Sequence, residues 1–296
     1  MTRGRPGAAK LIRQGKTALA DHFVFMTRRL DAFDSIPPDQ GRFPALRSAL
    51  DNGRGLAGDT ALFEGFYKVR FQLGAAVGRS VMYARDGRML GGNSAFAHIG
   101  SYEKRDDDSV DIVIQTVRHN PDPNYRAMAG TDDATLLAKG RADGALYRFE
   151  GGLKELPGVA FHSVMTPIEQ DAVPIAGGVG EGGIVNGLYS IHIRMLDGVE
   201  GGLTGVMLLN EGRILGGDAS FYYLGTYTSE KGRWKGQILN QEHTPAMGEN
   251  PIFGGHEVGI GFSGTCDKEG ALLEATALAG KRSLRMTAVL KLMHRV

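Results

Sequence analysis

The chain has 296 residues, 42% of them hydrophobic, and its formal net charge of +1 provides no basic stripe of the kind that nucleic-acid binding needs. A single cysteine, Cys266, excludes an internal disulfide and fits a reducing compartment. No run of 18 apolar residues and no clean signal-peptide core are present, so the sequence predicts neither a transmembrane helix nor secretion, and a cytoplasmic location is expected.

Residues 1–63 form a basic head, with 10 Lys and Arg against 6 Asp and Glu. Leu19, Met26 and Phe33 recur every seven residues, which predicts a helix over about 17–34. Pro37 and Pro38 follow and would end it. Such a helix would either bind a partner or a second copy of the chain, or fold onto the chain's own first domain.

From Gly65 the hydrophobic period changes to two, with Tyr67, Val69 and Phe71 alternating with polar residues. This alternation predicts antiparallel strands with one buried face and one solvated face. Asp86-Gly87 lies between apolar runs and predicts a hairpin turn. Further turn signals recur at short intervals, which favours an up-and-down β-barrel over 64–172.

An acidic run lies within this first domain, and its members are Asp106, Asp107 and Asp108, with Asp111 close behind. The run follows a predicted strand and therefore lies at a hairpin tip. One interpretation is a solvated tip that Lys104 and Arg105 partly neutralise. The other is a surface that binds a partner; a calcium site is disfavoured because the ligands lack EF-hand spacing.

A glycine-rich linker is predicted over 173–186, with glycine at most positions from 177 to 183. A flexible coil of about 14 residues spans roughly 20 Å. It would join two domains without fixing their orientation.

Residues 187–296 repeat the first domain. Gly91 matches Gly216, His119 matches His243, and Gly140 matches Gly264. One repeat at half the chain length predicts two homologous domains. A feature that both copies share is then architectural, and a feature of one copy is the better candidate for function.

Each copy carries a Gly-Gly-Asx motif, Gly91-Gly92-Asn93 in the first and Gly216-Gly217-Asp218 in the second. We interpret it as a structural corner, because Asn93 cannot act as a base. His119 and His243 are expected to be hydrogen-bonded at a barrel rim, since neither has a plausible set of metal ligands around it. The sequence therefore predicts no catalytic residue, no metal, no cofactor and no enzyme activity.

The motif and its surroundings resemble the GrlR family of negative regulators of type III secretion. The resemblance rests on the alternating strand, Gly-Arg-x-Leu-Gly-Gly-Asp, the aromatic cluster after it and Gly225-x-Tyr227, and it is stronger in the second copy. It implies lipocalin-like (calycin-type) barrels that restrain a transcriptional activator protein by binding it. It also implies that an acidic loop makes the contact, which places the partner site at Asp106, Asp107, Asp108 and Asp111 of the first copy alone.

The expected fold is all-β, with two tandem antiparallel lipocalin-like barrels after a helical N-terminal extension. A second function remains open, because a barrel of about eight strands can carry a small apolar ligand. The aromatic residues that would line its cavity, or simply fill the core, are Tyr189, Phe221, Tyr222, Tyr223 and Tyr227.

Overall fold

The structure is a computed structural model that describes residues 63–170, 177–196, 202–245 and 257–296. The predicted head helix over 17–34 lies outside these residues. The described parts of both repeats belong to one compact unit and contain β-strands and no helix.

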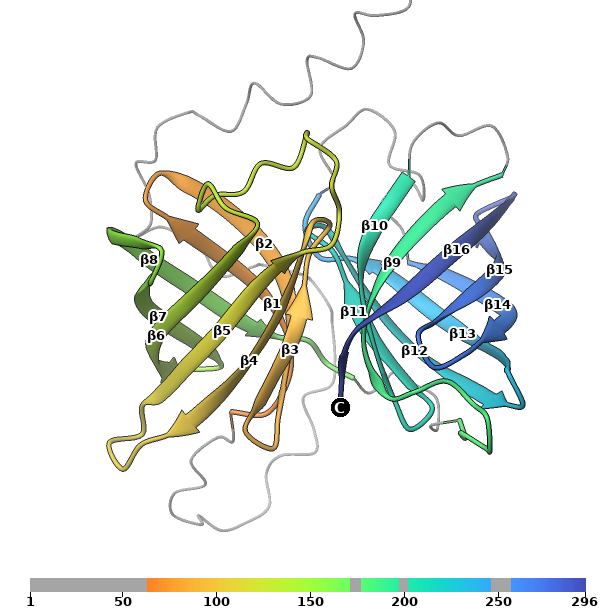
Figure 1. The fold of residues 1–296 in the computed structure, drawn as a ribbon, viewed down its shortest axis with the longest axis horizontal. Helices are drawn as coiled ribbons and strands as arrows, with labels where there is room; N and C mark the ends of the chain where they lie inside the picture. The colour runs from red at the N-terminus through yellow and green to blue at the C-terminus, as the bar shows by residue number, and fades with distance from the viewer. Residues whose placement is uncertain (1–62, 171–176, 197–201, 246–256) are drawn as a thin grey trace, which may run out of the picture. The chain divides into compact units, whose positions relative to one another are not determined.

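The first repeat forms a closed barrel of antiparallel strands, in which each strand pairs with the next and β8 returns to β1 (Figure 1). The strands are β1 (Gly65–Leu73), β2 (Ala76–Arg85), β3 (Arg88–Gly92), β4 (Phe96–Lys104), β5 (Val110–Arg118), β6 (Asp133–Asp143), β7 (Leu146–Leu153) and β8 (Leu156–Pro167).

The second repeat forms a barrel of the same order, closed between β16 and β9. Its strands are β9 (Gly187–Met195), β10 (Gly202–Asn210), β11 (Arg213–Gly217), β12 (Phe221–Glu230), β13 (Arg233–Glu242), β14 (Val258–Cys266), β15 (Gly270–Ala279) and β16 (Arg282–Arg295). The predicted all-β fold of two tandem antiparallel barrels is confirmed.

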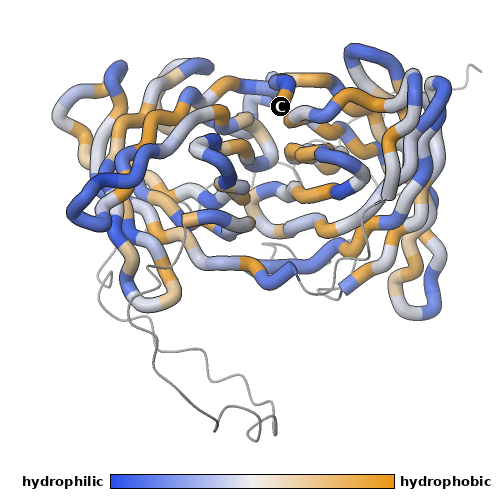
Figure 2. Tube along the Cα trace, turned by 90° about the horizontal axis from the view of Figure 1, so that it is seen from below, coloured by the Kyte–Doolittle hydropathy of each residue, from blue (hydrophilic) through white to orange (hydrophobic). Residues whose placement is uncertain are grey.

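Side-chain alternation explains why these segments form barrels. In β15, Ala271, Leu273 and Ala275 are buried inside the barrel, whereas Leu272 and Glu274 between them are exposed. Figure 2 shows the same interleaving of hydrophobic and hydrophilic residues along the chain. Each barrel therefore encloses its own apolar core.

The hairpin turns need backbone conformations that only some residues adopt readily. Asp86 and Gly87 have φ angles of 49° and 77°, and Glu211 and Gly212 have 48° and 82°. Two successive residues with positive φ make a type I′ turn, whose twist matches that of the flanking strands. The turns predicted at Asp86-Gly87 and its repeat are present.

The glycine-rich linker does not behave as the expected flexible coil over residues 177–183. This segment runs beside β12, with Val179 bridged to Ser229 in parallel, and the Gly180 amide donates to the Ser229 carbonyl at 2.7 Å. A Cβ atom on Gly177 would lie 1.7 Å from the Tyr227 carbonyl oxygen. The glycines are thus required by close packing, because β12 extends past the short β11 and leaves backbone groups to pair.

A third apolar core lies between the two barrels, on the outer faces of β1–β4 and β9–β12, and we call it the seam. Its members include Phe66, Val81, Leu90, Leu188, Val206 and Leu215. They form equivalent pairs from the two repeats, so that Val81 corresponds to Val206 and Leu90 to Leu215. Each barrel therefore uses the same surface to contact the other, as in a twofold dimer.

Candidate partner-binding site

The acidic run forms the tip of the hairpin between β4 and β5, as the sequence predicted. Five residues, 105–109, connect the two strands, and the Arg105 amide donates to the Ser109 carbonyl at 2.9 Å. Asp108 has a φ of 60°, a conformation that aspartate tolerates better than most residues. The tip is exposed except for Ser109, which is fully buried.

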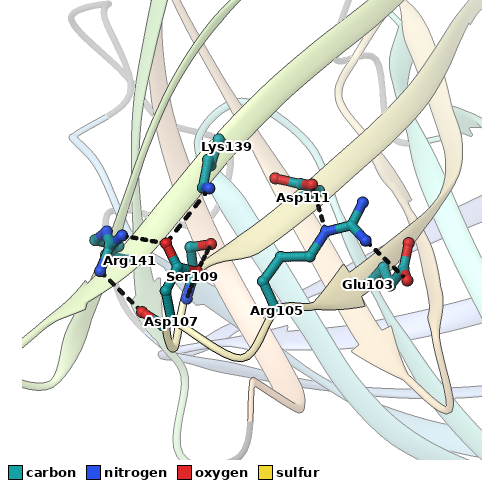
Figure 3. Close-up of polar contacts among 7 residues, drawn as sticks. All are labelled: Glu103, Arg105, Asp107, Ser109, Asp111, Lys139 and Arg141. Carbon is teal, nitrogen blue, oxygen red and sulfur yellow. Dashed lines mark hydrogen bonds and ion pairs between the residues drawn. The ribbon is translucent and has the colours of Figure 1, made fainter.

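Asp107 ties the tip to the neighbouring strand β6 (Figure 3). Its carboxylate accepts a hydrogen bond from Arg141 at 2.5 Å and lies 3.5 Å from the Lys139 ammonium. The same carboxylate accepts from the hydroxyl and the amide of Ser109. These Ser109 bonds, with the nearby cations, lower the pKa of Asp107 to about 2. The Asp107 carboxylate is therefore charged and already paired with groups of its own barrel, so its role is to hold the loop.

Arg105 pairs with two other carboxylates on the opposite side of the tip. Its guanidinium donates to Asp111 at 2.6 Å and lies 3.0 Å from a Glu103 oxygen. Figure 3 shows Arg105 between these two acids. A single exposed ion pair contributes little, but a network that links β4, the loop and β5 restricts the loop's conformation.

The four predicted partner-binding residues thus divide into two pairs. Asp107 and Asp111 are held by Arg141 and Arg105. Asp106 and Asp108 are exposed, and within the described residues their side chains make no hydrogen bond or ion pair. The arrangement presents two available carboxylates on a braced loop, which can pair with cationic side chains of a partner.

Sequence analysis missed Lys139 and Arg141, which brace the tip. They lie about thirty residues from Asp107, and only the β5–β6 pairing brings them to it. The available signal was their spacing of two, which places two side chains on the same face when the segment is a strand.

The equivalent hairpin of the second barrel lacks this site. Its turn is Lys231-Gly232, with φ angles of 50° and 71°, and Lys231 pairs with the adjacent Glu230 at 3.0 Å. The amides of Lys231 and Gly232 donate to the carbonyls of Glu181 and Gly182, each at 2.8 Å. The turn of the second barrel is therefore covered by the segment around Glu181 and Gly182. The acidic tip is present in the first barrel only.

The predicted cavity-lining aromatics belong to the packed cores. Tyr189, Tyr223 and Tyr227 are buried inside the second barrel, with Phe221 packed against the same core. Tyr222 points outward into the seam, where its ring contacts Phe66 at a centroid distance of 6.4 Å. Tyr189, Tyr223 and Tyr227 thus lie together in the packed core of the second barrel and do not line an open cavity.

The Gly-Gly-Asx motifs form corners of matching geometry. The Asn93 side-chain oxygen accepts the amides of Ala95 and Phe96, at 3.0 and 2.9 Å. The Asp218 side chain accepts those of Ser220 and Phe221, at 2.7 and 2.9 Å. The corners cap turns at the seam, with Gly91 and Gly216 inside the preceding short strands and Gly92 and Gly217 at their ends.

The two equivalent histidines lie on these corners. The His119 Nε2 atom is 3.0 Å from the Asn93 carbonyl oxygen, and that of His243 is 3.4 Å from the Asp218 carbonyl oxygen. Burial is the main cause that lowers the pKa of both histidines to about 4, so they are neutral near pH 7. Within the described ranges no three metal-ligating side chains come together.

Comparison with known proteins gives no family assignment. No family model matches the chain, and neither does any curated protein. One similar solved structure is that of a candidate outer membrane protein of Bacteroides fragilis, at 9% identity and a TM-score of 0.24, covering 79% of this chain and 98% of that one. A likeness this low bears neither on function nor on location. In the part of the chain that the structure describes, no helix is long and apolar enough to cross a membrane.

Proposed function

We propose that the chain is a non-enzymatic regulatory protein that binds a protein partner through the acidic tip of its first barrel. The observation that carries this proposal is the pair Asp106 and Asp108, two available carboxylates on a tip whose other charges are paired. Such a tip loses little conformational entropy when a partner binds. The resemblance to the GrlR family suggests a transcriptional activator as the partner.

The packing of the barrels supports a function on the outer surface. Tyr189 and Tyr227 are fully buried and, with Trp234, occupy the interior of the second barrel. Phe149 and Met89 do the same in the first. A carrier would keep that space for its ligand, so we place the carrier of a small apolar ligand second.

The distribution of polarity supports a barrel that works in water, and we propose a cytoplasmic location. Apolar side chains fill the interiors, and charged residues such as Lys139, Arg148 and Glu274 lie on the outer faces. A membrane-spanning barrel has the reverse arrangement, with an apolar band outside.

The partner proposal is tested by removing the charges of Asp106 and Asp108 while keeping the shapes of the two side chains. Tagged wild-type protein, the D106N/D108N variant and a Glu150→Gln control would each be used to retrieve partners from the native host. Glu150 is 82% exposed on the outer wall of the same barrel. A partner that wild type and Glu150→Gln retrieve, and D106N/D108N does not, supports the site.

If all three proteins retrieved the same partner, the acidic tip would be excluded as the binding site. Since the contact is between charges, the association rate should also fall as salt is raised. Mass spectrometry of gently purified protein tests the carrier alternative, because a stoichiometric lipid would place a ligand inside a barrel.

A further inference from the structure

In both barrels a long strand runs past the end of a short neighbour. β4 continues after its last pair with β3, and β12 continues after its last pair with β11. In β4 the Tyr102 amide donates to the Gly87 carbonyl at 2.9 Å, on the side of β3. Main-chain groups alternate between the two sides of a strand, so Lys104 directs its N–H and C=O to the same side as Tyr102, beyond the end of β3. Ser229 is the equivalent residue of β12, since each lies two residues after the tyrosine that makes this bond. We call residues 102–104 the β4 edge.

In the second barrel the chain itself covers the equivalent edge. The Ser229 amide donates to the Gly178 carbonyl at 2.9 Å, and the Ser229 carbonyl accepts from the Gly180 amide at 2.7 Å. The segment 177–183 thus runs parallel to β12, and Ser229 is only 3% exposed. Glycine permits this approach, because a Cβ atom on Gly183 would lie 2.8 Å from the Ser229 carbonyl oxygen.

The β4 edge has no such cover among the described residues. Within them no group bonds to the N–H or the C=O of Lys104, and Lys104 is exposed. The glycines before the two short strands show the same difference. A Cβ atom on Gly212 would lie 2.5 Å from the Gly177 carbonyl carbon. At the equivalent Gly87 it would meet only the Tyr102 carbonyl oxygen, at 3.8 Å. The β4 edge therefore offers a free donor and a free acceptor to an extended chain.

This edge leads directly into the acidic tip. In the second barrel the covering segment continues over the turn, where it accepts hydrogen bonds from the amides of Lys231 and Gly232. A segment that ran the same way along β4 would reach the tip two or three residues after the residue paired with Lys104. There it would meet the exposed carboxylates of Asp106 and Asp108, which pair with cationic side chains.

We propose that the β4 edge binds an extended segment of the protein partner, which runs parallel to β4 and brings a lysine or arginine to Asp106 and Asp108. Main-chain hydrogen bonds to Lys104 align the segment, as in other cases where a peptide adds a strand to a sheet edge. Small residues let its backbone approach, and its cation provides specificity. The inference rests on the proposed partner binding and adds the form of the bound segment, a glycine-containing stretch followed by a basic residue.

The probe is a seven-residue peptide with the sequence of residues 177–183, in which lysine replaces Glu181 and Gly182. It is titrated into the isotope-labelled full chain, and amide chemical shifts are followed by NMR. The control peptide carries N-methylglycine at the position of Gly180. It therefore lacks the N–H that would bond to the Lys104 carbonyl, and it requires no change in the protein.

Two variants at one position separate the main chain from the side chain. Lys104→Pro removes the N–H of the β4 edge, and proline is tolerated in a strand where that N–H has no partner in the sheet. Lys104→Ala keeps the N–H and removes only the side chain, so it is the matched control. D106N/D108N tests the contribution of the tip.

In the free chain the Lys104 amide should exchange with solvent faster than the hydrogen-bonded Ser229 amide. The lysine peptide should shift the amides of the β4 edge and of the tip, with a dissociation constant of roughly 1 mM. Binding should be roughly fivefold weaker for the N-methylglycine peptide and for Lys104→Pro. Lys104→Ala should bind the peptide at least as tightly as wild type.

Three results would overturn the proposal. The first is a Lys104 amide that is already protected from exchange in the free chain, because the edge would then be covered. The second is the absence of shifts at about 5 mM peptide. The third is equal binding of the two peptides with shifts confined to the tip, and this result would leave the acidic tip as the partner site. Equal binding by wild type and D106N/D108N would instead contradict the proposed function, on which the inference rests.

Discussion

Gly92 of the first barrel lies against Val206 of the second, so closely that a Cβ atom on Gly92 would come within 2.7 Å of the Val206 Cγ1 atom. The relation is reciprocal, because a Cβ on Gly217 would come within 3.0 Å of Val81 Cγ1. Both glycines also have φ angles near +155°. The second glycine of the repeated motif is therefore required by the contact between the barrels as well as by the corner itself.

Substituting either glycine by alanine should destabilise the protein strongly. In Gly92→Ala and Gly217→Ala the new methyl group would also meet the carbonyl oxygen of Phe96 or Phe221, at 2.4 or 2.3 Å. We expect each change to lower the free energy of unfolding by more than about 2 kcal/mol. Urea unfolding followed by circular dichroism measures this.

Gly261→Ala is the matched control, because a Cβ there meets no atom within 4 Å. It should change the free energy of unfolding by less than about 0.5 kcal/mol. If Gly92→Ala cost no more than this control, the close approach at the seam would not exist in solution.

Asp218 and Asn93 occupy equivalent corners. Asp218→Asn and Asn93→Asp should change the free energy of unfolding near pH 7 in opposite directions. Burial raises the pKa of Asp218, so above pH 3.8 the folded chain binds more protons than the unfolded chain, and stability falls as pH rises. Asp218→Asn removes this cost. Its amide can still accept the two backbone bonds and donate to the Tyr223 oxygen.

We expect Asp218→Asn to match wild type near pH 3 and to become more stable toward pH 7, by about 1.4 kcal/mol for each unit by which burial raises the pKa. Asn93→Asp should be destabilised at pH 7. Unfolding free energies across this pH range test both variants, and a destabilised Asp218→Asn at pH 7 would contradict the assignment.

The buried histidines should make the protein sensitive to acid. Burial lowers the pKa of His98 from 6.5 to about 4, and its Nδ1 atom is 3.1 Å from the Thr116 hydroxyl. Since the unfolded chain binds more protons in this interval, stability should fall as pH decreases from about 6.5 to about 4. His98 alone would contribute up to about 3 kcal/mol of this loss.

The measurement is the slope of unfolding free energy against pH, made in the Asp218→Asn background because Asp218 acts with the opposite sign. His98→Gln should flatten the slope between pH 6.5 and 4. An unchanged slope in His98→Gln would show that this histidine is already solvated in the folded protein.

The barrels could be predicted from the sequence because local signals were consistent. Alternation in Tyr67–Leu73 and the Asp86-Gly87 turn both indicated antiparallel hairpins. The seam could not be read from alternation, because Val81 and Val206 lie on faces expected to be solvated. Their strands nonetheless carry consecutive apolar residues, over 81–84 and 206–209, and that is the signal of a strand buried on both faces.

The candidate site was only half predictable for a different reason. The acidic run itself, Asp106–Asp108, is visible in the sequence. Which of its carboxylates remain available depends on Arg141 and Lys139, and strand register alone brings these to Asp107. Ion pairs between residues far apart in the sequence leave no local pattern. Only the structure therefore shows that Asp107 is held by cations of β6 while Asp106 and Asp108 are not.

The bracing of the acidic tip leads to a final prediction, on Asp107→Asn. The amide would lose its charge toward Arg141 and Lys139 and would accept more weakly from Ser109. We expect faster hydrogen exchange at the amides of 105–109 and little change in the global free energy of unfolding, because the pairs are exposed. Asp106→Asn, which removes an unbraced carboxylate, is the control and should leave exchange at these amides unchanged. A carbon-13 NMR titration of wild type should find the Asp107 carboxyl titrating at about pH 2. Titration near 3.8, together with unaltered exchange in Asp107→Asn, would mean that the tip is not braced by Asp107.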